Sequence, residues 1–131
     1  MKIRQLQIPR KKIFLIEDSE LFSFMVDYEL KHHFRRHLLY TFDSGELCLE
    51  HLQLSPDIVI LDYYLPGING DVLLHEIRNS PYCTNTKVIM LSNLTDMERV
   101  CKLMKDGADE FIEKGKNSPS SIVKIIAKWV A

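Results

Sequence analysis

The sequence contains few glycines, few prolines and few cysteines. Five glycines and five prolines in 131 residues exclude a collagen-like repeat and a disordered chain rich in these residues. The three cysteines, Cys48, Cys83 and Cys101, are odd in number and show no CxxC spacing. We therefore expect reduced, mostly structural thiols rather than a disulfide framework.

Long apolar runs and an excess of charge of one sign are also missing. No stretch approaches the roughly 18 apolar residues of a membrane-spanning helix, and the start, MKIRQLQIPRKK, lacks the apolar core of a secretion signal. Basic and acidic residues number 17 and 18, which argues against a protein that binds nucleic acid through a general positive field. We expect a cytoplasmic protein that contacts neither membrane nor nucleic acid directly. It would comprise a basic lead-in at residues 1–11 and a single domain at residues 12–131.

Five short segments have the composition of β-strands. Residues 13–16, 58–61 and 88–91 are apolar without alternation, which is typical of strands covered on both faces in the middle of a parallel sheet. Residues 38–42 and 111–112 are shorter or more polar, as edge strands are. The pattern therefore ranks five strands by their depth in one sheet.

Between these strands lie segments whose apolar residues recur with a helical period. Thr95 with Glu98 has the form of a capping box, and Ser118 followed by Pro119 has the form of a helix start. The apolar faces are formed by Leu21, Phe24, Met25 and Tyr28; Leu47, Leu49 and Leu52; Val72, Leu73, Leu74 and Ile77; Met97, Val100, Cys101 and Met104; and Ile122, Ile125, Ile126 and Trp129.

Strict alternation of strands and helices predicts an α/β fold with a doubly wound, five-stranded parallel sheet. With strands one, three and four central, the simplest order is 2-1-3-4-5, a flavodoxin-like three-layer sandwich. The winding reverses between strands one and three, and ligands of such sheets bind at the carboxyl ends of the strands near that point. The functional site is therefore expected at the carboxyl ends of strands one and three.

Charged and polar residues follow the predicted strands at that edge. Glu17 and Asp18 follow strand one, Asp62 strand three, Ser92 strand four and Lys114 strand five. Two carboxylates about 4 Å apart repel by about 4 kcal/mol at an effective dielectric constant near 20, and three with one lysine leave a charge of -3 + 1 = -2. Mg²⁺ suits such an oxygen-rich, open site and would leave one carboxylate free to act as a nucleophile.

Each of these residues also has a simpler interpretation. Asp18 or Ser19 could cap the first helix, and Asp62 could begin the turn at Leu-Pro-Gly. Ser92 could be a helix cap, and Lys114 a solvated loop lysine. Because four strand ends would have to carry the same chemistry by coincidence, the joint pattern favours a functional site.

These residues resemble the receiver domains of two-component response regulators, and the chain is similar to the single-domain chemotaxis regulator. The resemblance covers residues 12–129. It rests on the acidic pair in IFLIEDSE, the central segment DIVILDYYLPGINGDVLL, the hydroxyl residue in VIMLSN and the lysine in GADEFIEKG.

The resemblance implies that Asp62 accepts a phosphoryl group from a histidine kinase or a histidine phosphotransfer protein. Ser92 and Lys114 would contact the phosphoryl oxygens, and Phe111 stands where receivers carry a switch aromatic. The Mg²⁺ ligands would be Glu17, Asp18, Asp62 and the backbone carbonyl of Tyr64.

The sequence departs from the usual receiver pattern at three positions. Gly115 follows the lysine where proline is usual, Asn93 follows the hydroxyl residue where a small residue is usual, and Phe111 replaces a common tyrosine. None of the five core chemical positions is lost, so we expect a competent phosphoacceptor.

The signal would leave through the fourth helix, fifth strand and fifth helix toward a downstream protein effector. Val123 and Val130 of the last helix are candidates for a partner or homodimer contact, and packing in the core is an equally good interpretation. We expect no effector domain after Trp129, in which case the chain either signals through a separate partner or is a receiver excised from a longer chain.

Two other functions remain as alternatives. The chain could be a receiver-like module that binds partners without phosphorylation. A small hydrolase with an aspartyl nucleophile is less favoured, because Tyr64 stands where such enzymes place a second Asp.

Tyr64 and Leu94 are predicted to border the approach of water to a phosphorylated Asp62. Neither side chain offers a carboxylate or an amide that would orient the attacking water. We therefore expect a long-lived phosphorylated form.

The basic residues at 31–33 and 35–37 are expected to end the first helix, at the opposite end of the sheet from the carboxylates. Cations there stabilise the negative end of the helix dipole, and no zinc-ligand spacing accompanies the histidines.

Overall fold

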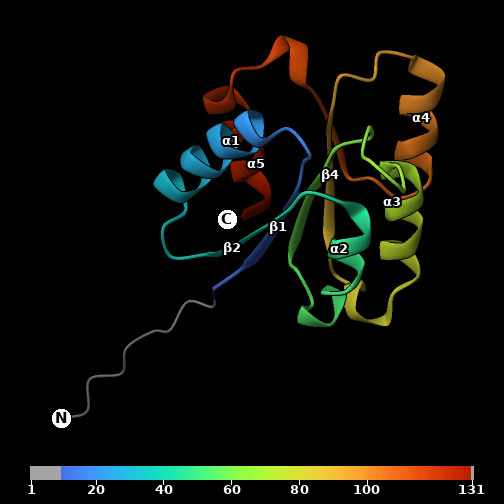
Figure 1. Ribbon diagram of the computed structural model, residues 1–131, viewed down its shortest axis with the longest axis horizontal. Coiled ribbons are helices and arrows are strands. Elements are labelled where there is room, and N and C mark those ends of the chain that lie inside the picture. The colour runs from blue at the N-terminus through green and yellow to red at the C-terminus, as the bar shows by residue number, and fades with distance from the viewer. Residues whose placement is uncertain (1–9, 131) are drawn as a thin grey trace.

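The computed structural model describes residues 10–130, which form alternating strands and helices (Figure 1). The strands are β1 (Lys12–Ile16), β2 (Leu38–Phe42), β3 (Ile58–Leu61), β4 (Lys87–Ser92) and β5 (Glu110–Glu113). The helices are α1 (Glu20–His33), α2 (Gly45–Leu49), α3 (Gly70–Asn79), α4 (Met97–Lys105) and α5 (Pro119–Val130). Short 3-10 turns are η1 (Leu52–Leu54), η2 (Pro81–Cys83) and η3 (Lys114–Lys116).

The strands form one parallel sheet in the order β2-β1-β3-β4-β5, which confirms the predicted topology. Ile16 of β1 pairs with Leu61 of β3, so the carboxyl ends of these two strands lie side by side. The predicted lead-in at residues 1–11 falls almost wholly outside the described residues. Within residues 10–130, every helix is too short or too polar to span a bilayer.

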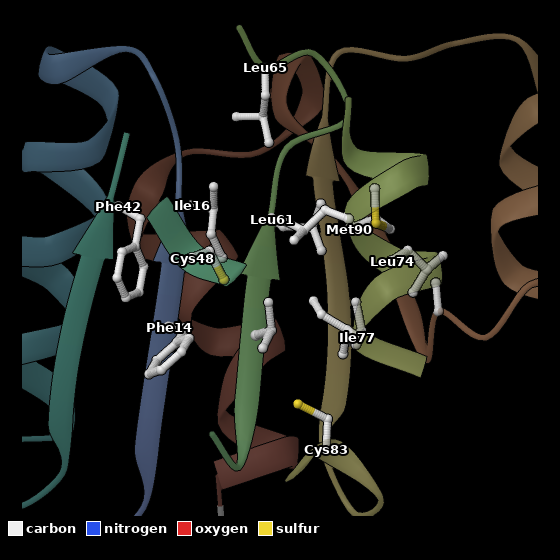
Figure 2. Close-up of a cluster of buried hydrophobic side chains, with 14 of the residues drawn as sticks. Phe14, Ile16, Phe42, Cys48, Leu61, Leu65, Leu74, Ile77, Cys83 and Met90 are labelled. Carbon is white, nitrogen blue, oxygen red and sulfur yellow. The ribbon is translucent and has the colours of Figure 1, made fainter. Parts of the chain in front are cut away.

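Helices cover both faces of the sheet. α1 and α5 pack on one face, over Ile13 and Leu15 of β1 and the facing residues of the other strands. α2, α3 and α4 lie on the other face (Figure 1), where Phe14 and Ile16 of β1 join Leu61 of β3 in the second cluster (Figure 2). β1, β3 and β4 are covered by helices on both faces, so side chains pointing to either face are buried. This is why their sequences are continuously apolar.

Local signals at the helix starts are partly confirmed. α5 begins at Pro119, and the hydroxyl of Ser118 accepts a hydrogen bond from the Ser121 amide at 3.1 Å. The predicted capping box of α4 is wrong, because Asp96 is the N-cap and accepts from the Glu98 amide at 3.0 Å. The carboxylate of Asp96 takes the place expected for the Thr95 hydroxyl.

The apolar face predicted for α1 points to solvent instead of the core. The helix has a second apolar face, in which Val26 and Leu30 are buried and Phe22 packs against them. The exposed face consists of Leu21 (70% exposed), Phe24 (68%), Met25 (36%) and Tyr28 (61%).

The apolar residues of α2, α3 and α4 are also placed in part differently from the prediction, since Leu47 of α2 and Val72 of α3 are 39% and 44% exposed. In α4, Leu103 is the buried residue and Val100 is partly buried, whereas Met97, Cys101 and Met104 are exposed. Leu52, grouped with the second helix, lies in η1 instead.

Val123 and Val130 of α5 belong to the core. They are 0% and 4% exposed and pack in the cluster between α5, α1 and the sheet. The hypothesis that they form a partner or homodimer contact is therefore wrong, because the side chains are already covered.

The cysteines match the expectation of structural thiols at two positions. Cys48 and Cys83 are buried and Cys101 is exposed, and all three are free. Burial, with a smaller contribution from Cys83, raises the pKa of the Cys48 thiol to about 12, which keeps it protonated and unreactive at neutral pH.

Candidate functional site

The end of β1 presents an acidic pair. The Glu17 amide continues the ladder by donating to the carbonyl of Phe42 at 3.0 Å, which fixes Glu17 at the edge of the sheet. Ser19 is the N-cap of α1, with its hydroxyl accepting from the Phe22 amide at 3.3 Å, and its own amide donates to Glu17 Oε1 at 3.2 Å. Ser19, and not Asp18, is therefore the N-cap of α1. The exposed Asp18 carboxylate remains available at the carboxyl edge of the sheet.

The end of β3 presents Asp62. Its amide donates to the carbonyl of Ile16 at 3.2 Å, and its Oδ1 accepts from the Tyr64 amide at 3.2 Å. The first residue of α3, Gly70, lies against this segment, since a Cβ at Gly70 would be 2.3 Å from the Asp62 carbonyl oxygen and 2.7 Å from Tyr63 Cα. The turn and the close helix start together fix the backbone on either side of the Asp62 carboxylate.

Lys114, which follows β5, connects the two acidic strand ends. Its Nζ donates to Glu17 Oε2 at 2.5 Å and to Asp62 Oδ2 at 2.9 Å. The side chains of Glu17, Asp62 and Lys114 are only 2%, 7% and 10% exposed. The ammonium also lies 4.5 Å from the centre of the Phe22 ring, a cation–π contact that helps to fix its position.

The three carboxylates predicted to converge do so. Glu17, Asp18 and Asp62 each offer an oxygen within 4.8 Å of the others. With Lys114 the four groups carry a formal charge of -2 when all are ionised. Hard oxygen donors, an uncompensated charge and one solvent-exposed member, Asp18, fit a divalent cation such as Mg²⁺.

Burial and the ion pairs shift the pKa values of this site. Burial raises the pKa of the Glu17 carboxyl above its usual value, against the opposing effect of Lys114. Burial acts to lower the pKa of Lys114, but its bonds to Glu17 and Asp62 outweigh that effect and raise it. Lys114 is therefore a firmly protonated cation, and Glu17 is a carboxylate that a further cation would help to keep ionised.

Ser92, Leu94 and Phe111 lie on the adjacent strands and loop. Ser92 ends β4 fully buried, and its hydroxyl accepts from the Leu94 amide at 3.3 Å. Phe111 of β5 is partly buried against the core cluster. Leu94 is 2% exposed and packs within the same cluster, and its influence on water at Asp62 stays a prediction. Tyr64, half exposed, is the only one of the two predicted flanking side chains that faces solvent.

Sequence reasoning missed two residues that support this site. Phe22 stacks under Lys114, but its position within α1 carries no sequence signal of that role. Glu46 of α2 accepts a hydrogen bond at 2.7 Å from the Ile68 amide, in the loop that follows Asp62. Gly67, with φ +72°, permits this contact, because a Cβ there would be 2.1 Å from Glu46 Oε1. The glycine in Leu-Pro-Gly indicated a turn but not its partner.

A cleft of about 430 Å³ opens beside the acidic pair, between α1, β2 and α2. It combines carboxylates with apolar side chains. The lining includes Glu17, Asp18, Glu20, Asp27, Phe24 and Leu47. The exposed Asp18 carboxylate, which follows β1, is therefore reachable from solvent on the α1 side.

Comparison with known proteins identifies the class. The pattern of the response regulator receiver domain matches residues 13–127. The chain therefore belongs to the receiver domain family of two-component response regulators.

Several known proteins are similar to this chain. The phosphate regulon transcriptional regulatory protein PhoB of Rhizobium meliloti is 28% identical over 117 residues, which are 88% of this chain and 51% of that protein. The two-component response regulator ARR3 of Arabidopsis thaliana is 31% identical over 72 residues, 55% of this chain and 31% of that protein. The chain thus spans about half, or less, of the length of these relatives.

Solved structures agree with the fold. The BeF3-activated receiver domain of DrrB has a TM-score of 0.80 and 26% identity, covering 92% of this chain and 97% of that one. The Mn²⁺-bound form of response regulator Rcp1 has a TM-score of 0.82 at 24% identity, covering 92% and 94%. The acidic group at Glu17, Asp18 and Asp62 is compatible with aspartyl phosphorylation in such a domain.

Proposed function

We propose that Asp62 accepts a phosphoryl group from a phosphohistidine of a histidine kinase or of a histidine phosphotransfer protein. The observation that carries the proposal is the position of the Asp62 carboxylate. It lies at the carboxyl end of the central strand β3, bonded to Lys114 and within 4.8 Å of carboxylate oxygens of Glu17 and Asp18. Three carboxylates and a fixed ammonium at one edge of the sheet therefore support the roles of nucleophile, metal ligands and phosphoryl-binding cation.

In the transfer, one Asp62 carboxylate oxygen bonds to phosphorus as the bond from phosphorus to the histidine nitrogen breaks. The backbone fixed by the Tyr64 amide and by Gly70 orients the attacking carboxylate. Lys114 Nζ, now bonded to Asp62 Oδ2, is placed to bond a phosphoryl oxygen and to offset its charge.

Glu17, Asp18, Asp62 and the backbone carbonyl of Tyr64 would hold Mg²⁺, which supplies charge neutralisation and polarisation of the phosphoryl group when bound. Glu17 would exchange part of its interaction with Lys114 for the metal. Each signal requires the transfer of only one phosphoryl group to Asp62. We therefore propose that the domain acts as a phosphoacceptor switch, with at most slow hydrolysis of its own phosphoryl group.

A small phosphodonor tests the proposal directly. Incubation with acetyl phosphate and Mg²⁺ should add the mass of one phosphoryl group, which intact-protein mass spectrometry detects. EDTA should prevent the addition. Absence of any addition with Mg²⁺, in protein whose circular dichroism shows a folded domain, would contradict the proposal and favour a receiver-like module that acts without phosphorylation.

The output would run through α4, β5 and α5 to a downstream protein effector. A phosphoryl group on Asp62 adds negative charge and acceptor oxygens near the end of β4, where the Ser92 hydroxyl is bonded to the Leu94 amide. Drawing that hydroxyl toward the phosphoryl group would release the loop and leave space for the partly buried Phe111. If amide exchange over residues 93–130 were unchanged by beryllofluoride with Mg²⁺, this route would be wrong.

A further inference from the structure

The loop of residues 63–69 joins β3 to α3 and carries Tyr64, whose backbone carbonyl is a proposed Mg²⁺ ligand. The base of the loop is closed by the first amide of α3, which donates to the Tyr63 carbonyl at 2.7 Å. Near its other end, the Ile68 amide donates to Glu46 Oε1 of α2 at 2.7 Å. Within the part of the chain that the structure describes, this is the hydrogen bond that ties the loop to an element other than the two it joins.

Two glycines allow α2 and the loop to approach this closely. Gly67 has φ +72°, and a Cβ on it would be 2.1 Å from Glu46 Oε1. Gly45, the buried first residue of α2, would with a Cβ be 2.7 Å from Ile68 Cγ1. The contact is therefore made from both sides, since α2 provides a carboxylate for the loop and the loop places the Ile68 side chain on α2.

The apolar core fixes a different part of the same loop. Leu65 is 7% exposed and packs in the cluster that also contains Cys48 of α2 (Figure 2). The two residues that follow Leu65 are exposed, so core packing does not fix the backbone there. The bond between Glu46 and the Ile68 amide is placed to fix that stretch.

The Glu46 side chain is an exposed anion. The hydrogen bond from the Ile68 amide, with a further one from the amide of Glu46 itself, lowers the pKa of this carboxyl below its usual value. Because the group is exposed, solvent screens its charge. We therefore expect its effect in the placement of the loop rather than in the global stability of the fold.

We propose that Glu46 is a positioning residue for the Mg²⁺ site that serves the phosphoacceptor. By bonding the Ile68 amide, it holds the loop in the conformation in which the Tyr64 carbonyl can bind the metal. This inference rests on the proposed function, which assigns that carbonyl to the metal.

The coordination of Mg²⁺ makes its affinity sensitive to such a contact. Mg²⁺ binds its ligands at about 2.0–2.1 Å and tolerates little deviation from octahedral geometry, so a ligand on a loosened loop binds it poorly. Residues that directly orient a metal ligand change affinity by about 10–100-fold when they are replaced. Glu46 acts through Ile68, four positions after Tyr64, so the expected effect is smaller, about three- to tenfold.

Glu46 also stands in the first turn of α2, where a negative charge favours the helix dipole. Glutamine at this position separates the two roles, because its amide oxygen can still accept from the Ile68 amide although the charge is lost. Glu50, the exposed C-cap of the same helix, is the matched control for the loss of one carboxylate.

Calorimetric titration with Mg²⁺ tests the proposal on wild-type protein, Glu46→Ala, Glu46→Gln and Glu50→Ala, with circular dichroism showing that each is folded. Glu46→Ala should weaken Mg²⁺ binding about three- to tenfold, and Glu46→Gln should recover most of that loss. Glu50→Ala should keep the wild-type affinity. An unchanged affinity in Glu46→Ala, or an equal loss in Glu46→Gln or in Glu50→Ala, would overturn the proposal.

A second variant disturbs the same contact from the loop. Gly67→Ala places a methyl group against Glu46 Oε1 and should also weaken Mg²⁺ binding. Its effect should be much smaller in the Glu46→Ala background, because the contact is already lost there. The backbone strain at φ +72° is present in both backgrounds and cancels from the comparison. Full additivity of the two changes in the logarithm of Kd would overturn the proposal.

Labelling by acetyl phosphate separates this proposal from the proposed function. If the wild type gains a phosphoryl group while Glu46→Ala binds Mg²⁺ as tightly as the wild type, only the positioning role of Glu46 is refuted. If Glu46→Ala binds Mg²⁺ more weakly but the wild type gains no phosphoryl group, the phosphoacceptor function is refuted and the positioning role at the metal site is supported.

Discussion

Replacing Lys114 with methionine removes the only cation that bonds both Glu17 and Asp62 in the described part of the chain. Methionine preserves much of the side-chain volume, so the change acts mainly on charge. The two carboxylates left behind are 2% and 7% exposed and would repel each other across the space that the ammonium occupied. The folded protein should therefore lose stability wherever no other cation replaces the lysine.

The expected loss is about 3 kcal/mol in the free energy of unfolding at pH 7 without divalent cations. A hydrogen bond to a charged group contributes about 1.5–3 kcal/mol, and Lys114 makes two, at 2.5 and 2.9 Å. Removing one partner of a buried ion pair typically costs about 3–5 kcal/mol. Burying the Lys114 ammonium costs desolvation free energy, and the uncharged methionine does not bear this cost. The net loss of stability should therefore lie at the lower end of that range.

The loss should depend on pH with a defined sign. Burial raises the pKa of Glu17 above its usual value of 4.5, so the folded protein retains a proton that the unfolded chain has lost. Stability therefore falls as the pH rises from about 4.5 through the folded pKa. Without Lys114 that pKa should rise further, so the destabilisation should grow from pH 5 to pH 7. The contribution of Lys114 itself is fully present below 10.5, because its pKa is raised in the folded state.

Urea unfolding with EDTA, followed by circular dichroism, measures the effect. Lys116→Met is the matched control, because Lys116 is 76% exposed and 3.5 Å from Glu113, a surface pair that should contribute less than about 1 kcal/mol. Mg²⁺ should restore more stability to Lys114→Met than to the wild type, because the site then carries -3 and binds the cation more tightly; at 100 times Kd the gain is about 2.7 kcal/mol. Equal stability of the Lys114 and Lys116 variants in EDTA would refute the reasoning.

Further predictions concern the backbone, the lifetime of the phosphoryl group and the metal. Gly70→Ala should lower the free energy of unfolding by about 1–3 kcal/mol and slow phosphorylation by acetyl phosphate at least about tenfold, because its Cβ would be 2.3 Å from the Asp62 carbonyl oxygen. Gly115→Ala is the control: its Cβ would be 3.8 Å from the nearest atom, so neither quantity should change. Tyr64→Asn should shorten the half-life of the phosphorylated form about tenfold or more, measured as loss of the added mass, because the amide can orient a water; an unchanged half-life would show that Tyr64 does not set the rate. Asp18→Asn should weaken Mg²⁺ binding in calorimetry while leaving the fold intact, and an unchanged affinity would remove Asp18 from the ligand set.

The sheet and the acidic cluster could be predicted because both follow from short-range patterns. Continuous apolar strands such as residues 58–61 indicate burial on both faces, and the residue after each strand must lie at the carboxyl edge of a parallel sheet. Glu17, Asp62 and Lys114 were therefore placed together without any knowledge of their side-chain contacts.

The helix faces could not be predicted because α1 and α4 each carry more apolar residues than the core accepts. Periodicity shows that Phe24 and Tyr28 share a face, but burial went to Val26 and Leu30, whose side chains fit between α5 and the sheet. The same competition placed Val123 in the core. Contacts between distant segments, such as Glu46 with the loop after Asp62, leave no periodic signal in the sequence.

The central claim is that Asp62 is the phosphoacceptor, and one comparison tests it most directly. Wild-type protein and Asp62→Asn are incubated with acetyl phosphate and Mg²⁺, and the intact masses are measured. The amide keeps the shape of the carboxylate and can still accept from the Tyr64 amide, so the fold should persist while the nucleophile is lost. We expect one base-labile phosphoryl group on the wild type and none on Asp62→Asn. Undiminished labelling of the variant would contradict it.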